Sequence, residues 1–482
     1  MNKYDTAIIG SGPNGLAAGI LLIQAGLSVV ILEANDRVGG GTRTSELTIP
    51  GYKHDVCSAV HPLGAGSPFF QTLPLTEYGL KWIYPPKSVV HPFDDGQAAY
   101  ISRSVDDTAD SLDSDSAAYR RLMMPFLHSS EALLKDILSP LSFPSDASSL
   151  IRFGLQAFRP AQKFAYDKFS GKKARALFAG LSAHSILPLN KLFTSAFGLM
   201  LGITAHKPGW PIPEGGSQRI ADVLSSYFKS FGGEIITSHI VRNLSDIPES
   251  RIKIFDLTPA QIIRIMKDTL PSGYLRKLSR YRYGPGVFKI DYALSEPVPF
   301  KSKECSDSAA IHIGGDIEEI ALSEYQVWQD KTPLKPFIIF VQPTLFDKTR
   351  SPDGKHTAWA YCHVPSGSVT DMTDRIENQI ERYAPGFRDT ILARNKMNTE
   401  DLESYNANYV GGDINGGAQD WKQLFSRPVF SLSPYSMPLK GFYICSSSTP
   451  PGGGVHGMCG YNAAKKILKD YNIRFPVRKF TR

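Results

Sequence analysis

The sequence predicts an α/β protein organised around a Rossmann-type nucleotide-binding unit near its N-terminus. Three observations lead to this prediction. A β-branched, apolar run at 4–9 is followed at once by the glycine pattern G-x-G-x-x-G and then by an apolar helical stretch. A second apolar run, 28–32, ends in an acidic residue, and another glycine-rich run follows it. This order of strand, glycine turn, helix, strand and acid is that of a dinucleotide-binding βαβ unit.

Each glycine of the first turn has a separate role. Gly10 permits a tight turn after the strand, and Gly12 lets the backbone approach a pyrophosphate. Gly15 lets the helix pack closely on the strand. The helix N-terminus offers unpaired N–H groups and a partial positive charge to phosphates. The predicted cofactor contacts of this turn are Gly10, Gly12, Pro13, Asn14 and Gly15.

The residue after the second strand is Glu33. A carboxylate at this spacing accepts hydrogen bonds from both ribose hydroxyl groups, and it would repel a 2′-phosphate. The sequence therefore predicts a dinucleotide other than NADP at this position. The alternative is a tight turn in an ordinary α/β domain.

The stretch that follows, DRVGGGTR, holds glycines at 39–41 between two arginines. A nicotinamide-binding unit has no need of this second glycine run, whereas a flavin enzyme has, because its backbone passes beside the pyrophosphate and the ribityl chain. Arg37 or Arg43 could neutralise phosphate charge, or each could be a solvated surface arginine. The predicted contacts in this stretch are Arg37, Gly40, Gly41 and Thr42.

Together the patterns G-x-G-x-x-G…E and R-x-G-G resemble the FAD-binding start of the superfamily of phytoene desaturases, amine oxidases and retinol saturases. The resemblance implies FAD as the cofactor. It also implies a Rossmann-type FAD domain interleaved with an α+β substrate domain. We expect 1–70, 208–270 and 425–475 to form the discontinuous FAD domain, and 71–207 and 271–424 to form the substrate domain.

The middle stretch 209–244 resembles the superfamily's middle FAD segment, with P-x-G-G, a helix, G-G-x-I and a strand in succession. We expect strands at 234–237 and 239–244. By this resemblance the backbone of a β-branched residue pairs with the adenine edge. Ile240 or Val241 occupies the matching position.

A second glycine-rich signature, GFYICSSSTPPGGGVHGMCGYNAA, spans 441–464. It reads as a short buried strand, a glycine/proline loop and a helix start, and the helix dipole would stabilise negative charge on reduced flavin. The signature resembles the closing FAD motif of phytoene desaturase-like proteins. It is closest to the retinol saturase-like and pyridine nucleotide-disulfide oxidoreductase domain-containing protein 2-like group, since carotenoid desaturases commonly carry proline at the His456 position. This difference argues against a carotene substrate.

By the same resemblance one run of residues lies beside the isoalloxazine ring: Gly453, Gly454, Val455, His456, Gly457 and Met458. His456 is the candidate catalytic residue, because an imidazole near flavin could move a proton or stabilise anionic flavin. The alternative is a structural histidine that bonds loop carbonyl groups.

Composition limits the classes of function. The chain has 482 residues, enough for two intertwined domains, and a diffuse net charge of +7 that suits anionic ligands or membrane surfaces and not nucleic acid. Five widely spaced cysteines without a C-x-x-C pair predict neither a disulfide framework nor a metal site. A strand that begins almost at the first residue, and apolar runs shorter than about 20 residues, predict a cytoplasmic protein.

Two further stretches allow alternative interpretations. The stretch 145–175 is apolar and basic, so it is either a membrane-surface helix or a substrate-domain helix with a charged outer face. Trp359, Tyr361 and His363 alternate onto one face of a predicted strand, which is either a pocket wall or a sheet face packed on helices.

The resemblance implies hydride exchange between a C–H bond of an apolar substrate, isoprenoid or lipid in class, and flavin N5. With one nucleotide domain, oxygen, a quinone or a protein is the expected electron acceptor. Two alternatives remain: a flavin amine oxidase-like enzyme, and a flavin-free carrier of the Rab escort/GDI type. The sequence leaves the oligomeric state open.

Overall fold

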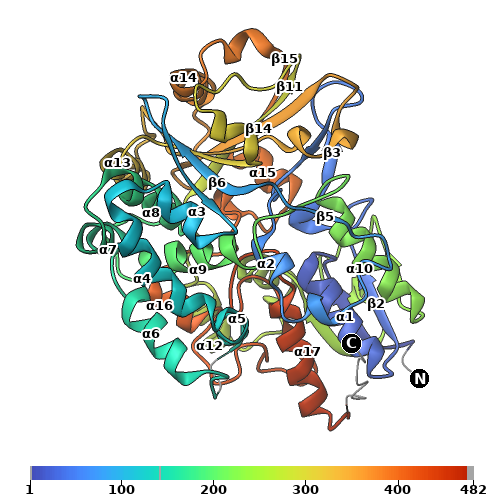
Figure 1. The fold of residues 1–482 in the computed structure, drawn as a ribbon. Helices are drawn as coiled ribbons and strands as arrows, with labels where there is room; N and C mark the ends of the chain where they lie inside the picture. Colours follow the sequence, from blue (N-terminus) through green and yellow to red (C-terminus); the bar gives the residue numbers. More distant parts are fainter. Residues whose placement is uncertain (1–2, 141–142, 475–482) are drawn as a thin grey trace.

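The computed structural model describes residues 3–140 and 143–474, and two sheets dominate it (Figure 1). The first sheet has five strands in the order β16-β10-β1-β2-β9, and every neighbouring pair is parallel. Its strands are β1 (Tyr4–Ile9), β2 (Val29–Leu32), β9 (Glu234–Ile236), β10 (Ser250–Phe255) and β16 (Phe442–Ile444). The α/β class and the parallel sheet that the sequence predicts are confirmed.

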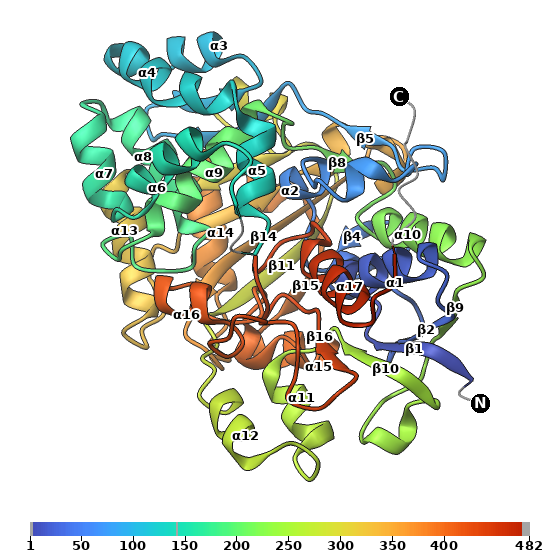
Figure 2. The same ribbon diagram turned by 90° about the horizontal axis from the view of Figure 1, so that it is seen from below.

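Helices cover both faces of this sheet, which explains why β2 and all of β1 except Asp5 are buried without alternation. On one face α1 packs against α10 and α17, and Figure 2 shows the three side by side over β1 and β2. On the other face α11 and α12 bury a second core against the same strands. The bounds are α1 (Pro13–Gln24), α10 (Gln218–Ser230), α11 (Pro259–Met266), α12 (Ser272–Leu278) and α17 (Met458–Asp470).

One expected strand does not form. The chain leaves β9 and turns back over the end of β2, where the His239 N–H donates to the carbonyl of Glu33 (2.8 Å). It then enters a 3-10 turn at Leu244–Asp246, and the Asn243 side chain caps that turn. The expected strand at 239–244 is therefore wrong, because its backbone groups bond across the strand ends instead of extending the sheet. This path exposes 239–242 to the cavity described below.

The second sheet is mixed and has seven strands in the order β15-β11-β14-β13-β12-β6-β7. One face packs on α14, and the other faces a helical layer that includes α8, α9 and α13. The strands are β6 (Lys87–Pro92), β7 (Ala98–Ser102), β11 (Gly286–Leu294), β12 (Ala310–Ile313), β13 (Ile338–Val341), β14 (His356–Val364) and β15 (Ile391–Met397). The helices are α8 (Lys172–Ala183), α9 (Thr194–His206), α13 (Ile317–Val327) and α14 (Thr373–Tyr383).

The remaining elements are short. Two small sheets pair β3 (Thr44–Glu46) with β4 (Lys53–Asp55) and β5 (Trp82–Ile83) with β8 (Ile212–Pro213). The other helices are α2 (Pro62–Ala65), α3 (Val105–Asp110), α4 (Ser116–Leu127), α5 (Ser130–Ile137), α6 (Ala147–Ala157), α7 (Ala161–Lys168), α15 (Thr399–Tyr405) and α16 (Trp421–Ser426). Within the described parts of the chain, no helix is long and apolar enough to cross a bilayer.

The two sheets divide the chain by segment. All five parallel strands come from 1–70, 208–270 and 425–475, and all seven strands of the mixed sheet come from 71–207 and 271–424. This is the interleaved architecture that the resemblance implied. The domain boundaries themselves stay a prediction, and their ends at 1–2 and 475 lie outside the described residues.

Candidate cofactor and substrate site

A single cavity of about 830 Å³ runs between the two sheets. The glycine turn after β1 and the loop before α17 both line it, and so does the mixed sheet through β13 and β14. Two motifs about 440 residues apart in the sequence therefore meet at one space. The cavity has a polar end at the parallel sheet and an apolar end at the mixed sheet.

At the polar end, close packing requires glycine at several positions. A Cβ at Gly15 would lie 2.2 Å from the Gly10 carbonyl oxygen, and a Cβ at Gly40 would lie 3.0 Å from the Gly12 Cα. The first and second glycine runs thus touch each other. Gly10, Gly12, Pro13, Asn14, Gly40 and Gly41 line the cavity, whereas Gly15 lies behind it and holds α1 close to the turn. Side-chain-free backbone at a helix N-terminus fits a pyrophosphate.

The Glu33 carboxylate lines the cavity but is already fully hydrogen-bonded. One oxygen accepts from the Ser11 N–H (3.1 Å) and hydroxyl, and the other accepts from Asn35 and from the Arg43 guanidinium (3.0 Å). A carboxylate has about four acceptor sites, so ribose hydroxyls would have to replace one of these partners. Its role as the ribose acceptor stays a prediction.

Of the two arginines in DRVGGGTR, Arg43 lines the cavity. It is 5% exposed and forms the ion pair with Glu33, and its guanidinium lies 5.3 Å from the centroid of the Tyr405 ring. Arg37 is exposed and donates to the Thr44 carbonyl. Thr42 is buried, and its hydroxyl donates to the Gly39 carbonyl. The arginine that lines the cavity is therefore Arg43, whereas the contacts predicted from the sequence named Arg37.

Sequence reasoning missed Asp256, which follows β10 and lines the same end of the cavity. Its carboxylate accepts from the Gly15 N–H (2.9 Å) and leaves no space for a Cβ at Gly12. Burial raises the pKa of Asp256 to about 7, the Glu33 charge adds to the rise, and the backbone N–H groups oppose it. Its position at the carboxyl end of a parallel strand was the available signal.

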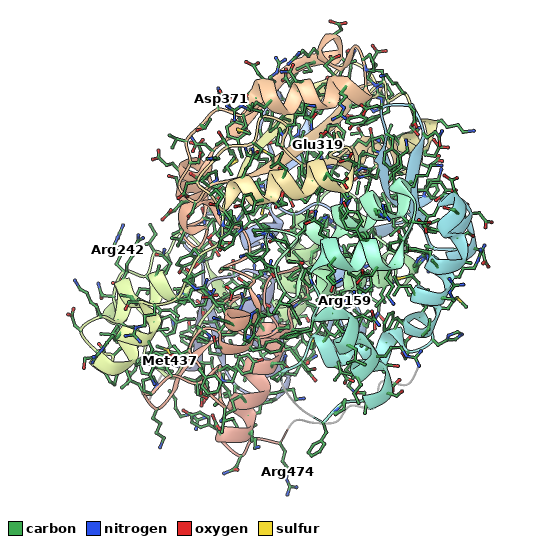
Figure 3. All side chains as sticks on the ribbon, turned by 90° about the vertical axis from the view of Figure 1, so that its left-hand side faces the viewer. Arg159, Arg242, Glu319, Asp371, Met437 and Arg474 are labelled. Carbon is green, nitrogen blue, oxygen red and sulfur yellow. The ribbon has the colours of Figure 1, made fainter. Side chains whose placement is uncertain are left out.

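Ile240 and Val241, the predicted adenine contacts, line the cavity beyond Glu33, together with Arg242 and Arg264. Ile240 is half-exposed, and Val241 packs against the core under β1 and β2. Figure 3 shows Arg242 on the outside of the molecule at this end. The geometry brings both predicted residues to the polar end, although they lie on irregular backbone and not on a strand.

The loop before α17 divides its residues between the cavity and the core. Gly454 and Val455 line the cavity, whereas His456, Gly457 and Met458 are buried behind it. The His456 Nδ1 accepts from the Met458 N–H (3.0 Å), and its carbonyl accepts from the Ser67 hydroxyl. Burial lowers the pKa of His456 to about 4, so the ring is neutral. Its contacts support the loop, and its catalytic role stays a prediction.

The glycine-rich loop at 411–417 also reaches the cavity. Ile414 and Asn415 line it, and a Cβ at Gly453 would lie 3.1 Å from the Asn415 carbonyl oxygen. The buried Asp413 carboxylate holds this loop, since it accepts from the backbone N–H groups of Gly284, Asn415 and Gly417. Glycine content alone did not reveal this role, because the loop neither follows a strand nor begins a helix.

The apolar end is a wall of aromatic and aliphatic side chains. Trp359 and Tyr361 stack with their ring centroids 5.4 Å apart, and both line the cavity. The strand face that the sequence left ambiguous is therefore a pocket wall for these two residues, whereas His363 is buried and bonds Glu324. The rest of this end comes from the facing strands and helices: His184, Leu201, Trp210, Ala310, Ile339 and Val341.

Charge is segregated along the cavity. The charged lining residues are Glu33, Arg43, Arg242, Asp256 and Arg264, all at the polar end. Among the described residues, no lysine lines the cavity, and the lining from the mixed sheet and from α9 carries no charged side chain. His184 bonds His312 through the Nε2 atoms (3.0 Å), and burial lowers the pKa of His184 to about 3. This end therefore favours an uncharged ligand.

Comparison with known proteins agrees with this geometry. Residues 8–73 match the family model described as an NAD(P)-binding Rossmann-like domain. The chain is 25% identical to pyridine nucleotide-disulfide oxidoreductase domain-containing protein 2 of Rattus norvegicus, over 97% of this chain and 94% of that protein. It is 20% identical to one of the limonene dehydrogenase polypeptides of Castellaniella defragrans, over 98% of this chain and 96% of that protein. A 43-residue stretch, 9% of this chain and 8% of the other, is 58% identical to flavin-containing amine oxidase B of Rattus norvegicus.

Solved structures match the whole fold. An oxidoreductase from Methanosarcina mazei aligns with a TM-score of 0.65 at 17% identity, over 96% of this chain and 99% of the other. A putrescine oxidase aligns with a TM-score of 0.62 at 17% identity, over 98% of this chain and 99% of the other. The resemblance predicted from the glycine motifs is confirmed. Over nearly its whole length the chain is similar to pyridine nucleotide-disulfide oxidoreductase domain-containing protein 2, and it shares the fold of the Methanosarcina mazei oxidoreductase and of putrescine oxidase.

Proposed function

We propose that this chain is an FAD-dependent oxidoreductase that exchanges hydride with a C–H bond of a neutral, apolar substrate of isoprenoid or lipid class. The observation that carries the proposal is the shape of the cavity. It is charged and glycine-lined at one end, and neutral and aromatic at the other, with no barrier between them. A dinucleotide and an apolar molecule can therefore share one continuous cavity.

The residues at the polar end fit FAD. Gly12 and Gly40 line the cavity with bare backbone, a Cβ at either would collide with Asp256 or with Gly12, and the N-terminus of α1 favours the pyrophosphate. Arg43 supplies a buried positive charge beside them. Gly454 and Val455 line the path toward the apolar end, so they are the residues of the closing motif that would contact the flavin.

When bound, the flavin supplies the redox chemistry by taking up or returning hydride at N5. The chain's own residues position the substrate and exclude water. Trp359 and Tyr361 present a flat apolar wall, which suits an unsaturated or cyclic hydrocarbon. No carboxylate lines this end among the described residues, so the neutral wall itself orients the substrate without a strong general base.

Amine oxidation is the second candidate, because the putrescine oxidase fold covers nearly the whole chain. The aromatic wall would suit an amine as well as a hydrocarbon. The charge distribution favours the first proposal, since a cationic amine would find neither a carboxylate nor a cavity lysine at the apolar end. Oxygen, a quinone or a protein remains the proposed electron acceptor.

Anaerobic flavin reduction separates the two candidates. The purified FAD-containing protein is mixed with a cyclic monoterpene or a polyene in one series, and with putrescine or a primary monoamine in the other. We expect the flavin absorbance to bleach with the hydrocarbon series and to persist with the amines. Bleaching by the amines alone would establish the second candidate. Colourless protein that takes up no added FAD would contradict both and favour a carrier.

A further inference from the structure

We propose that the outer face of α6 and α16 docks on a lipid bilayer that contains anionic phospholipids. We call it the docking face and define it by its exposed large apolar residues: Ile151, Leu155, Phe158, Leu192, Trp421 and Phe425. The proposal rests on the distribution of apolar and charged residues, and it does not depend on the proposed reaction. Figure 3 looks onto this side of the molecule, with Arg159 labelled between α6 and α7.

The apolar residues at the outer side of α6 and at its C-terminal end form an exposed stripe. Ile151, Leu155 and Phe158 follow at spacings of four and three residues, so they share one side of the helix. Ile151 is 63% exposed and Leu155 is 71% exposed, whereas Phe153 and Ala157 are buried in the core. This helix therefore has two apolar sides, of which one faces away from the protein. Such a contiguous exposed patch marks an interaction surface.

Ring contacts join α6 to α16 across the face. The Phe158 ring lies 5.9 Å from Trp421 and 6.0 Å from Phe193, and Phe193 lies 5.6 Å from Phe425, all between centroids. The stripe of α6 and the aromatics of α16 are thus one surface. Phe430 and Leu432 stand almost fully exposed in the loop beyond α16. Tryptophan and phenylalanine are residues that settle at a bilayer interface.

The exposed charges directly beside the apolar residues are positive, whereas the acids that cap the two helices, Asp146 and Asp420, bond Ser149 and Arg282. Lys172 and Lys173, farther along the chain, pair with Asp95 and Asp113. Arg152, Lys191 and Lys422 are exposed next to the apolar residues of the docking face, and the Lys422 ammonium lies 5.8 Å from the Trp421 ring centroid. Residues 147–206 carry eight Lys or Arg and a single acid, a net charge of +7 that equals that of the whole chain. That acid, Asp167, is paired with Arg159 and Lys163. No acid occurs at 421–440.

The exposed apolar side chains and the cations beside them together indicate a lipid bilayer as the partner of the docking face. Exposed apolar side chains flanked by unpaired cations match the boundary between acyl chains and anionic headgroups, where each basic residue near the surface adds attraction. The docking face also lies one helical layer from the cavity, because α6 packs on α9 and the Leu201 side chain of α9 lines the cavity. Docking would bring this helical layer next to lipid.

Vesicle flotation of the full, FAD-containing chain tests the proposal. Vesicles of phosphatidylcholine alone are compared with vesicles of equal parts phosphatidylcholine and phosphatidylglycerol. We expect the protein to float with the mixed vesicles, to bind the neutral ones less, and to be released by added salt. The double variant Ile151→Glu/Leu155→Glu should weaken the partition by at least about tenfold, because two exposed apolar side chains no longer enter the interface.

The matched control is Leu322→Glu on α13, where the leucine is 56% exposed. It adds a carboxylate at a similar exposed apolar position away from the face, and it should float as the unmodified protein does. Flavin content and melting temperature show that each variant is folded. Protein that binds neither type of vesicle would overturn the proposal. Equal binding of Ile151→Glu/Leu155→Glu and Leu322→Glu to the mixed vesicles would overturn it as well. A dimer in light scattering that the double variant dissociates, without vesicle binding, would assign the face to a second copy.

Discussion

At the scale of single residues, the polar end of the cavity depends on a small set of buried charges. Arg43 lies between the Glu33 carboxylate and the Tyr405 ring, and Asp256 lies beneath the glycine turn. Sequence patterns predicted the acid after β2 but could not separate Arg37 from Arg43. Both arginines flank the same glycines, and only the turn at Gly40–Thr42 decides which one points inward.

Replacing these two arginines tests the distinction. Arg43→Ala leaves a buried carboxylate without its cation, so we expect the free energy of unfolding to fall by about 3 kcal/mol and FAD to be lost on dialysis. Arg37→Ala at the exposed position should change little. Urea denaturation and flavin absorbance measure both effects. A larger loss in Arg37→Ala than in Arg43→Ala would contradict the assignment.

Asp256 gives the flavin-free protein a pH dependence. Burial holds the pKa of Asp256 at about 7, above the ordinary value of 3.8, so the folded state binds a proton that the unfolded state has released. Between about pH 4 and pH 7, stability therefore falls as the pH rises, by at most about 1.4 kcal/mol per pH unit. Urea denaturation of Asp256→Asn should show a shallower fall across this window. An unchanged pH profile in the variant would contradict the role of this group.

At the scale of elements, two helices meet at the cavity because glycines let them approach. A Cβ at Gly460 in α17 would lie 1.8 Å from the Asn14 carbonyl oxygen of α1. The sequence predicted both helices and their glycine loops, but it could not show that the helices pack on each other. This contact also explains why α17 begins where it does, close to the first turn of α1.

A pair of glycine substitutions tests this packing. Gly460→Ala must push α17 away from backbone atoms, so we expect a loss of more than about 2 kcal/mol and a lower melting temperature. Gly154→Ala in α6 meets open space and should raise stability by about 0.5 to 1 kcal/mol, because alanine favours a helix. Calorimetry compares the two. Equal melting temperatures would contradict the close approach of α1 and α17.

At the scale of the whole molecule, the sequence predicted the interleaving of two sheets from motifs spread along the chain. It could not predict what fills the space between them. The Trp359 and Tyr361 face was ambiguous because alternation is the same for a wall and for a packed sheet. The cavity contacts of the loop at 411–417 depend on the long-range hydrogen bonds of Asp413. Local sequence patterns do not reveal such long-range contacts.

The central claim is that the two distant glycine motifs hold one FAD in one cavity, and cofactor content tests it most directly. The purified protein is denatured and the released flavin is counted against protein. We predict one FAD per chain in the unmodified protein and none in Glu33→Arg, which crowds the ribose end and removes the partner of Arg43. A chain that carries no flavin and takes up none, or a Glu33→Arg variant that is fully loaded, would contradict the account.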